Sequence, residues 1–276
     1  AIPAGDANTD TLLLLYTKTD GSPQGDTIAS QPASAGASVA PDIYRMATPT
    51  AFTPADLVIA TPASRAIPCN LRVTTVACVG DPCGAPLNAT NVAVTAATGV
   101  ANMTAGILFN LGPVPRVLAY AIRGGNLTLC DYMMNDCGLV ANTCNAAIWV
   151  PIAGNIVSLN AQYGRDPSAT MDGIVDVHDQ TTPAPAPLPV TVPTYECKWA
   201  RISAGRSARV ARSANFEKTP GTGAGPGTAP APAWEGSAAN AINLTANASW
   251  QNYRYKVIQT VVPLRNLAWQ GVPTGC

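Results

Sequence analysis

Four aspartates lie close together in one polar segment, at Asp166, Asp172, Asp176 and Asp179, with Gly173 among them. Ca²⁺ prefers roughly six to eight oxygen ligands, taken mainly from carboxylates and loop carbonyls. Asp166, Asp172 and Asp176 are therefore the predicted ligands of a calcium loop, although their spacing differs from that of an EF-hand. Asp and Gly also favour turns for backbone reasons, so an ordinary turn is the competing interpretation.

The only histidine of the chain, His178, lies in the same segment. A Ser-His-Asp hydrolase would have to use this imidazole as its base. The sequence contains no G-x-S-x-G nucleophile elbow, which is the local signature of one large hydrolase class. We therefore predict no catalytic residue, and we expect His178 at the surface.

Arginines gather between residues 197 and 212, at Arg201, Arg206, Arg209 and Arg212. The last three recur at every third position, as on a helix, whereas the apolar residues between them alternate, as in a strand. These arginines could form a strip for DNA, a solvated face, or salt bridges to neighbouring subunits. Because 16 basic residues are balanced by 16 acidic ones, and DNA-binding proteins normally carry a basic excess, nucleic acid is disfavoured as a partner.

Eight cysteines in a chain with one histidine and no C-x-x-C pair predict disulfides in an oxidising compartment, not a zinc or haem site. Cys78 and Cys83 flank a short loop whose Gly and Pro suit a tight turn. Cys130 is expected to pair with either Cys137 or Cys144. Residues 130–147 are interpreted as a Cys-rich insertion.

The elements that position these residues are predicted to be strands and ordered loops. Charged residues make up only 12% of the chain, and 25 prolines keep helices short. Alternation over residues 156–163 and 253–262 indicates strands, the second of them central in its sheet. The apolar run at residues 12–16 is far shorter than the roughly 20 residues of a membrane-spanning helix, and it predicts a buried strand.

Two apolar runs, at residues 117–122 and 127–130, flank Gly124-Gly125 and predict a hairpin. Stretches rich in Pro, Ala and Gly, at residues 180–194 and 219–233, are expected to be exposed loops. Because strand-like sequence resumes after each stretch, we expect residues 1–276 to form a single globular headpiece.

Segments spread over nearly the whole chain match one known family, both in their residues and in their order along the chain. The most specific are Gln162-Tyr163-Gly164 and residues 250–257, Trp-Gln-Asn-Tyr-Arg-Tyr-Lys-Val. The others are residues 52–59, 69–74, 116–127, 155–166, 172–176, 199–218 and 262–266. In these segments the chain resembles the PilW-type minor pilins of the bacterial type IV pilus.

The resemblance implies an α+β, mostly β fold: a pilin-like antiparallel sheet headpiece with long disulfide-stapled loops. The prepilin leader and hydrophobic N-terminal helix of the family are not present in this sequence, so a soluble headpiece is expected. In the family, that helix would be the only part to contact the membrane. In many pilins a disulfide pins the C-terminal loop, which here would join Cys197 to Cys276. Pilins and related pseudopilins sometimes hold calcium in loops like that of Asp166.

The function implied by the resemblance is that of a non-enzymatic subunit. It would take part in the priming or tip complex of the pilus, on the cell surface, and would support adhesion and twitching motility. Its expected partners are other minor and major pilins and a tip adhesin of the PilY family. The alternative is a secreted carbohydrate- or surface-binding adhesive β-protein unrelated to pili.

Overall fold

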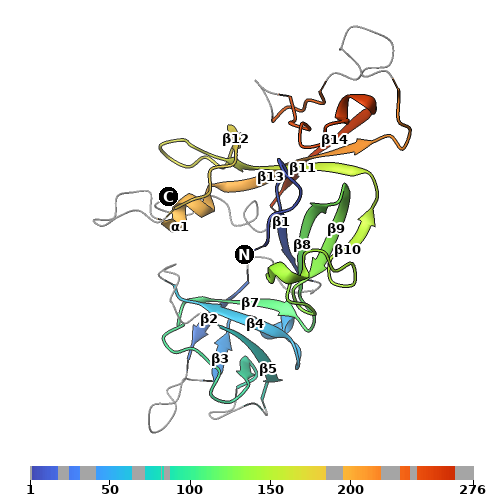
Figure 1. Cartoon of the computed structure of the whole chain (residues 1–276). Helices are drawn as coiled ribbons and strands as arrows, with labels where there is room; N and C mark the ends of the chain where they lie inside the picture. Colours follow the sequence, from blue (N-terminus) through green and yellow to red (C-terminus); the bar gives the residue numbers. More distant parts are fainter. Residues whose placement is uncertain are drawn as a thin grey trace. The chain divides into compact units, whose positions relative to one another are not determined.

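A computed structural model describes residues 2–17, 25–31, 42–63, 72–81, 83, 88–184, 195–218, 231–236 and 241–264. The described chain is mostly β, with strands β1 to β14 and only short helices (Figure 1). All strand pairs with an assigned register are antiparallel, which confirms the mostly β, antiparallel part of the predicted fold.

The chain divides into two compact units, whereas the sequence suggested a single headpiece. Unit 1 comprises Ala1–Leu15, Arg116–Val190 and Cys197–Cys276, and unit 2 comprises Tyr16–Pro115 with Thr191–Glu196. Each unit has its own hydrophobic core, so the two are described separately below.

Unit 2 is a closed barrel of six strands. Its order is β2 (Asp26–Ser30), β3 (Ile43–Met46), β6 (Asn91–Val94), β5 (Val73–Val79), β4 (Leu57–Thr61) and β7 (Ile107–Gly112), and β7 pairs back onto β2. Alternate side chains of these strands point inward, and Tyr44, Val58 and Leu108 are fully buried there. Closure removes the unpaired edges that an open sheet would present.

The first sheet of unit 1 has the order β1 (Leu12–Tyr16), β8 (Arg116–Arg123), β9 (Asn126–Asp131) and β10 (Val150–Ala153). Strands β8 and β9 form the predicted hairpin. Gly124 and Gly125 make its turn with φ angles of +58° and +72°. Residues other than Gly, Asn and Asp rarely adopt a positive φ angle, which explains why two glycines occupy this turn.

The second sheet of unit 1 has the order β12 (Val177–Asp179), β11 (Ile156–Arg165), β13 (Ile202–Arg212) and β14 (Tyr255–Pro263). Helix α1 (Tyr195–Ala200) leads into β13, so the ambiguous 197–212 segment is helical at its start and extended after it. The prediction that the last strand is central was wrong: β14 pairs only with β13 and is an edge strand among the described residues.

The first residues of the chain join the two sheets of unit 1. The Asp6 amide donates to the Ile122 carbonyl of β8 at 2.7 Å, and the Asp10 amide donates to the Leu159 carbonyl of β11 at 2.8 Å. Directly before Asp6, Gly5 approaches β8 so closely that a Cβ there would lie 2.6 Å from the Ile122 oxygen. This approach requires glycine, because real Cβ atoms do not come so near to a carbonyl oxygen.

Little regular structure is found in the cysteine-rich segment. Residues 132–149 consist of turns and the short helix η2 (Val140–Asn142), attached to β9 by the Cys130–Cys137 disulfide. Most of the expected loops 180–194 and 219–233 lie outside the described residues. The described helices include none that is long and apolar enough to span a membrane.

Candidate functional site

An apolar row lies uncovered along β14, at the edge of the second sheet of unit 1. Ile258 and Val262 are 52% and 53% exposed, although both belong to a regular strand. They share one face of the strand with Thr260, because side chains two residues apart point the same way. On β13 the residues paired with Ile258, Thr260 and Val262 are Arg209, Ser207 and Gly205. We call Ile258, Thr260, Val262 and their strand the β14 surface.

The middle of β14, between Lys256 and Pro263, lacks the features that usually protect a sheet edge. Natural edge strands are blunted by charges, prolines or bulges. Here Lys256 and Pro263 stand at the two ends of β14, and the six residues between them, Val257 to Val262, carry no charge. The pairing with β13 runs from Tyr255 to Pro263 without a register shift. An uncharged edge with uninterrupted pairing suits contact with another protein chain.

The apolar run at residues 12–16 is a second uncovered edge. It forms strand β1, as predicted, but the expectation that it is buried was wrong. Leu13 is 51% and Leu15 61% exposed. Composition alone predicts burial of four leucines, whereas their exposure depends on what packs against the strand in three dimensions.

The predicted calcium loop has a different organisation. Asp166 is buried, and its carboxylate accepts hydrogen bonds from the backbone amides of Ser168, Asp172 and Gly173 at 2.9, 2.7 and 2.8 Å. Burial opposes ionisation of this group, but the amide bonds from Gly173, Ser168 and Asp172 outweigh it and lower the pKa of Asp166 to about 2. The carboxylate is thus directed at N–H groups, which repel a cation.

The carbonyl oxygens of the same loop face Arg201. This buried guanidinium donates from Nη1 to the carbonyls of Asp166 and Ser168, and from Nη2 to that of Ala169. A positively charged group therefore already occupies the oxygens that a metal ion would use. Nothing in the local sequence identifies Arg201 for this role, because it lies 35 residues along the chain from Asp166.

The remaining aspartates do not complete a metal site. Asp172 accepts the amide of Ile174 at 2.8 Å, as in an ordinary turn, and Asp179 forms an ion pair with Arg165. That hydrogen-bonded pair lowers the pKa of Asp179. The described residues contain no group of three His, Cys, Asp or Glu side chains able to hold a metal. These contacts favour the turn interpretation of the loop, and calcium binding by Asp166, Asp172 and Asp176 stays a prediction that a calcium titration can test.

His178 lies half-buried on β12, where it pairs with Gly164 of β11. Its Nε2 is buried without a hydrogen-bond partner in the described part of the chain. Burial lowers the pKa of His178, and the charge of Arg206 lowers it further against the opposing charge of Glu235. In the described residues no serine or carboxylate bonds to this imidazole, so they form no Ser-His-Asp triad.

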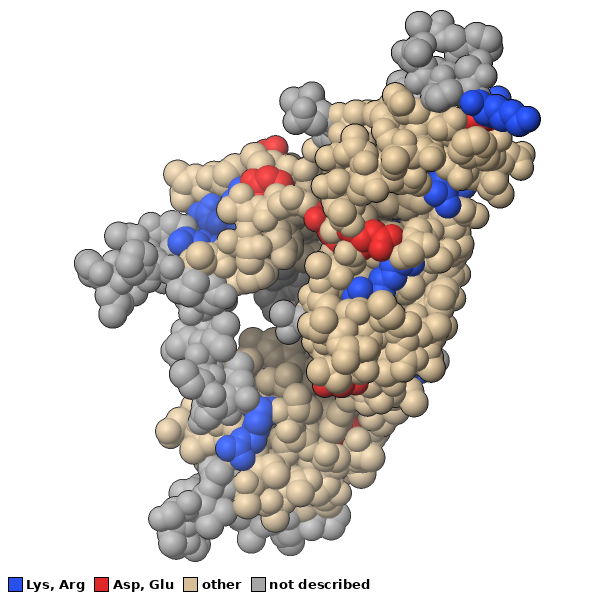
Figure 2. Space-filling view, in the orientation of Figure 1, with Lys and Arg blue, Asp and Glu red and all other residues tan. Residues whose placement is uncertain are grey.

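The four arginines do not form a strip. Arg201 is buried in the loop, and Arg206 is held by Gln162 Oε1 at 2.9 Å and by the Glu235 carboxylate at 3.7 Å. Arg212 lies over the Tyr253 ring, with its guanidinium carbon 4.5 Å from the ring centroid. Of the four, Arg209 alone is exposed. In the view of Figure 2, basic and acidic side chains are scattered over the described surface in small groups.

Two disulfides are present among the described cysteines. Cys78 bonds to Cys83 across the short loop, and Cys130 bonds to Cys137, which decides between the two partners considered for Cys130. Cys144 is a free, exposed thiol. Cys197 is disulfide-bonded. Cys276 lies outside the described residues, so a Cys197–Cys276 bond stays a prediction.

No protein-family model, curated protein or solved structure gives a significant match to this chain.

Proposed function

We propose that this chain is a non-enzymatic minor subunit of a bacterial type IV pilus, of the PilW type, and that its β14 surface docks against sister subunits. The observation that carries the proposal is the exposed pair Ile258 and Val262 on β14, an edge strand among the described residues whose stretch from Val257 to Val262 carries no charge. An apolar edge with no charge within it is a liability for a solitary secreted protein, but it is useful to a protein that works inside an assembly.

The segments that resemble the family support this assignment through their positions. Gln162-Tyr163-Gly164 lies in β11, and residues 250–257 lead through the helix η3 (Trp250–Asn252) into β14. Both therefore belong to the sheet that carries the β14 surface. The disulfides suit the oxidising space outside the inner membrane, where pili are assembled.

The subunit would act by surface complementarity in a priming or tip complex, and would support adhesion and twitching motility from there. Its partners would be other minor and major pilins and a PilY-family tip adhesin. It would reside at the cell surface, as part of the fibre. A pilin-like headpiece would then correspond to the sheets of unit 1.

Photo-crosslinking in living cells tests this proposal. A benzophenone amino acid at Val262 of the full-length protein should give adducts with other pilins, identified by mass spectrometry. The same probe at Ile174, a loop residue that is at least as exposed as Val262, is the matched control and should give none. Release of uncrosslinked protein into the medium, free of fibres, would instead favour the secreted adhesive β-protein.

A further inference from the structure

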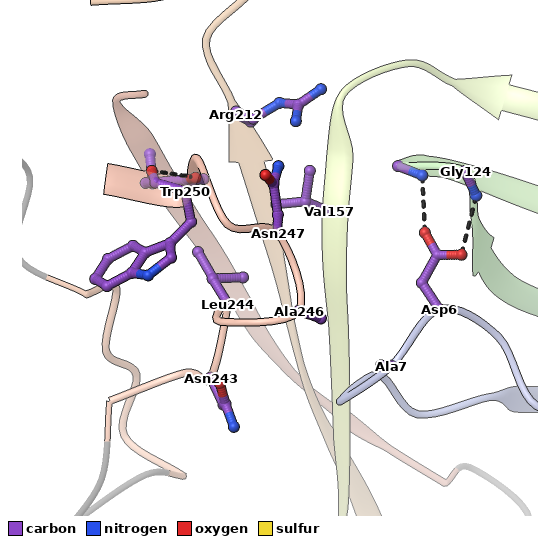
Figure 3. A pocket seen from close by; sticks show the side chains of 12 residues that line it. Asp6, Ala7, Gly124, Val157, Arg212, Asn243, Leu244, Ala246, Asn247 and Trp250 are labelled. Carbon is purple, nitrogen blue, oxygen red and sulfur yellow. Dashed lines mark hydrogen bonds between the residues drawn. The ribbon is translucent and has the colours of Figure 1, made fainter. Parts of the chain in front are cut away.

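A cleft of about 420 Å³ opens within unit 1. Its lining includes Tyr255, the first residue of β14, but not Ile258, Thr260 or Val262. One wall is the loop of residues 243–250, and the other is formed by Asp6, Ala7 and the β8–β9 turn, with Val157 and Arg212 between them (Figure 3). Its volume is at the small end of the roughly 300–1,000 Å³ range of small-molecule sites.

Arg212 supplies a positive charge to the cleft. Its Nη2 donates to Asn155 Oδ1 at 3.2 Å, and its guanidinium is stacked on Tyr253. In the described part of the chain no carboxylate lies within ion-pair distance of Arg212, and its Nε is buried without a hydrogen-bond partner. A guanidinium has five N–H donors, so most of its donor capacity remains for a ligand.

Asp6 supplies a negative charge on the opposite wall. Its carboxylate oxygens accept the backbone amides of Gly124 and Gly125 at 3.0 and 2.8 Å (Figure 3). These two bonds fix the position of the carboxylate. It can still accept further hydrogen bonds, because a carboxylate has about four lone-pair sites. One cation and one anion on facing walls make the cleft neutral, and this disfavours a ligand of either net charge.

Two asparagines add hydrogen-bond donors. Asn247 Oδ1 accepts the Ser249 amide at 3.0 Å, and Asn243 Oδ1 accepts the Thr245 amide at 3.0 Å. Because the oxygens are used in these turns, each side chain is oriented and its NH₂ group is left for a ligand. Asn247 points toward Arg212 (Figure 3).

The rest of the lining is apolar or aromatic. Leu244, Val157, Trp250 and Tyr255 belong to one hydrophobic cluster and also line the cleft. We propose that the cleft binds a neutral saccharide of one or two sugar units. Sugar hydroxyls both donate and accept, as the carboxylate, the guanidinium and the amides here require, while the C–H face of the ring packs on apolar and aromatic side chains. This proposal uses nothing from the assignment to a pilus.

NMR titration of the ¹⁵N-labelled 276-residue chain tests the proposal, with glucose, galactose, N-acetylglucosamine and maltose as probes. We expect at least one of them to shift the Trp250 indole N–H signal and the Gly124 and Gly125 amides, with a dissociation constant on the order of 1 mM. Glucuronate and inorganic phosphate are the charged comparisons and should bind more weakly.

A matched pair of variants identifies the donor. Asn247→Asp keeps the turn oxygen and removes the NH₂ group, and it should weaken sugar binding about fivefold. Asn145→Asp is the control, because exposed Asn145 makes the same turn with the Ala147 amide at 2.9 Å, outside the cleft. If Asn247→Asp fails to fold, Asn243→Asp replaces it, with Asn88→Asp as its control, since both accept an amide and a hydroxyl from the Thr two residues on.

Three results would overturn the proposal. The first is that no neutral sugar shifts the cleft signals. The second is that glucuronate or phosphate binds more tightly than every neutral sugar, which would indicate an anion site at Arg212. The third is that the cleft variant and its control lose affinity equally.

Discussion

Asp166 and Arg201 bind each other through reciprocal contacts: the Asp166 amide donates to the Arg201 carbonyl at 3.0 Å, and Arg201 Nη1 donates to the Asp166 carbonyl at 3.1 Å. The Asp166 carboxylate also accepts hydrogen bonds from three backbone amides of its own loop. Together the contacts of the two residues tie the loop after β11 to the residue that precedes β13.

Replacing Asp166 with Asn should destabilise the protein by about 2 kcal/mol, because the amide side chain loses the charge that the three N–H donors favour. Urea denaturation at pH 7 measures this. Asp136→Asn is the control: Asp136 accepts a single amide, from Gly138 at 3.1 Å, in an exposed segment, and its replacement should change the free energy of unfolding by less than about 0.5 kcal/mol.

The same carboxylate predicts a pH dependence. The pKa of Asp166 is lowered from its ordinary 3.8 to about 2. Because the folded state has the lower pKa, the stabilisation is fully present above pH 4 and is lost as the pH falls toward about 2. The difference in free energy of unfolding between wild type and Asp166→Asn should therefore shrink over that interval. A difference that stays constant down to pH 2 would show that the charge has no part in it.

Arg201→Lys should also lower stability, by about 1–3 kcal/mol, because a compact ammonium cannot span the three loop carbonyls that the planar guanidinium reaches. Arg209→Lys is the control, because Arg209 lies exposed on β13, the strand that follows Arg201, and this change should be nearly neutral. Thermal unfolding of both variants supplies the measurement. Equal stability of the two variants would mean that Arg201 contributes only through its positive charge, which lysine retains.

Calcium should leave the thermal midpoint unchanged, because the loop carbonyls bond to Arg201 and the Asp166 carboxylate faces amides. Extracellular calcium modules bind their ion at about 0.1–1 mM, so a titration to several times this concentration is a sufficient test. A saturable rise of the midpoint, reversed by chelator, would restore the calcium interpretation.

Gly5→Ala should destabilise unit 1 by more than about 1 kcal/mol, because the added Cβ would lie 2.6 Å from the Ile122 carbonyl oxygen and push the first residues off β8. Gly205→Ala is the control: a Cβ there meets no atom within 4 Å, and its φ is not in the left-handed region. This second change should be neutral or stabilising by up to about 1 kcal/mol. Denaturation of the two variants side by side measures the contrast.

Local patterns in the sequence predicted the local parts of the fold. The Gly124-Gly125 pair between apolar runs predicted its hairpin, because turn type and register are set by neighbouring residues. Alternation predicted β11 and β14 as strands. It could not place β14 at an edge, since that position depends on which strands lie beside it, and alternation does not encode this. The closure of the barrel through β2 and β7, which are about 80 residues apart, is non-local for the same reason.

The candidate sites show the same division. The clustered aspartates signalled an ordered loop, but the partner that decides its chemistry, Arg201, is 35 residues from Asp166. The leucines of β1 signalled a strand, but composition could not show that it stays uncovered. The cleft has no local signature at all, because Asp6, Gly124, Arg212 and Asn247 come from four separate segments.

Substitution of Ile258 by Lys in the full-length gene, expressed in a strain lacking its own copy, tests docking through the β14 surface most directly. Ile174→Lys is the matched control, since both isoleucines are exposed, at 52% and 61%, and neither change should unfold the protein. We predict that Ile258→Lys abolishes surface fibres and twitching while Ile174→Lys supports both. Normal fibres from the Ile258→Lys strain, with the protein present at wild-type levels, would contradict the account.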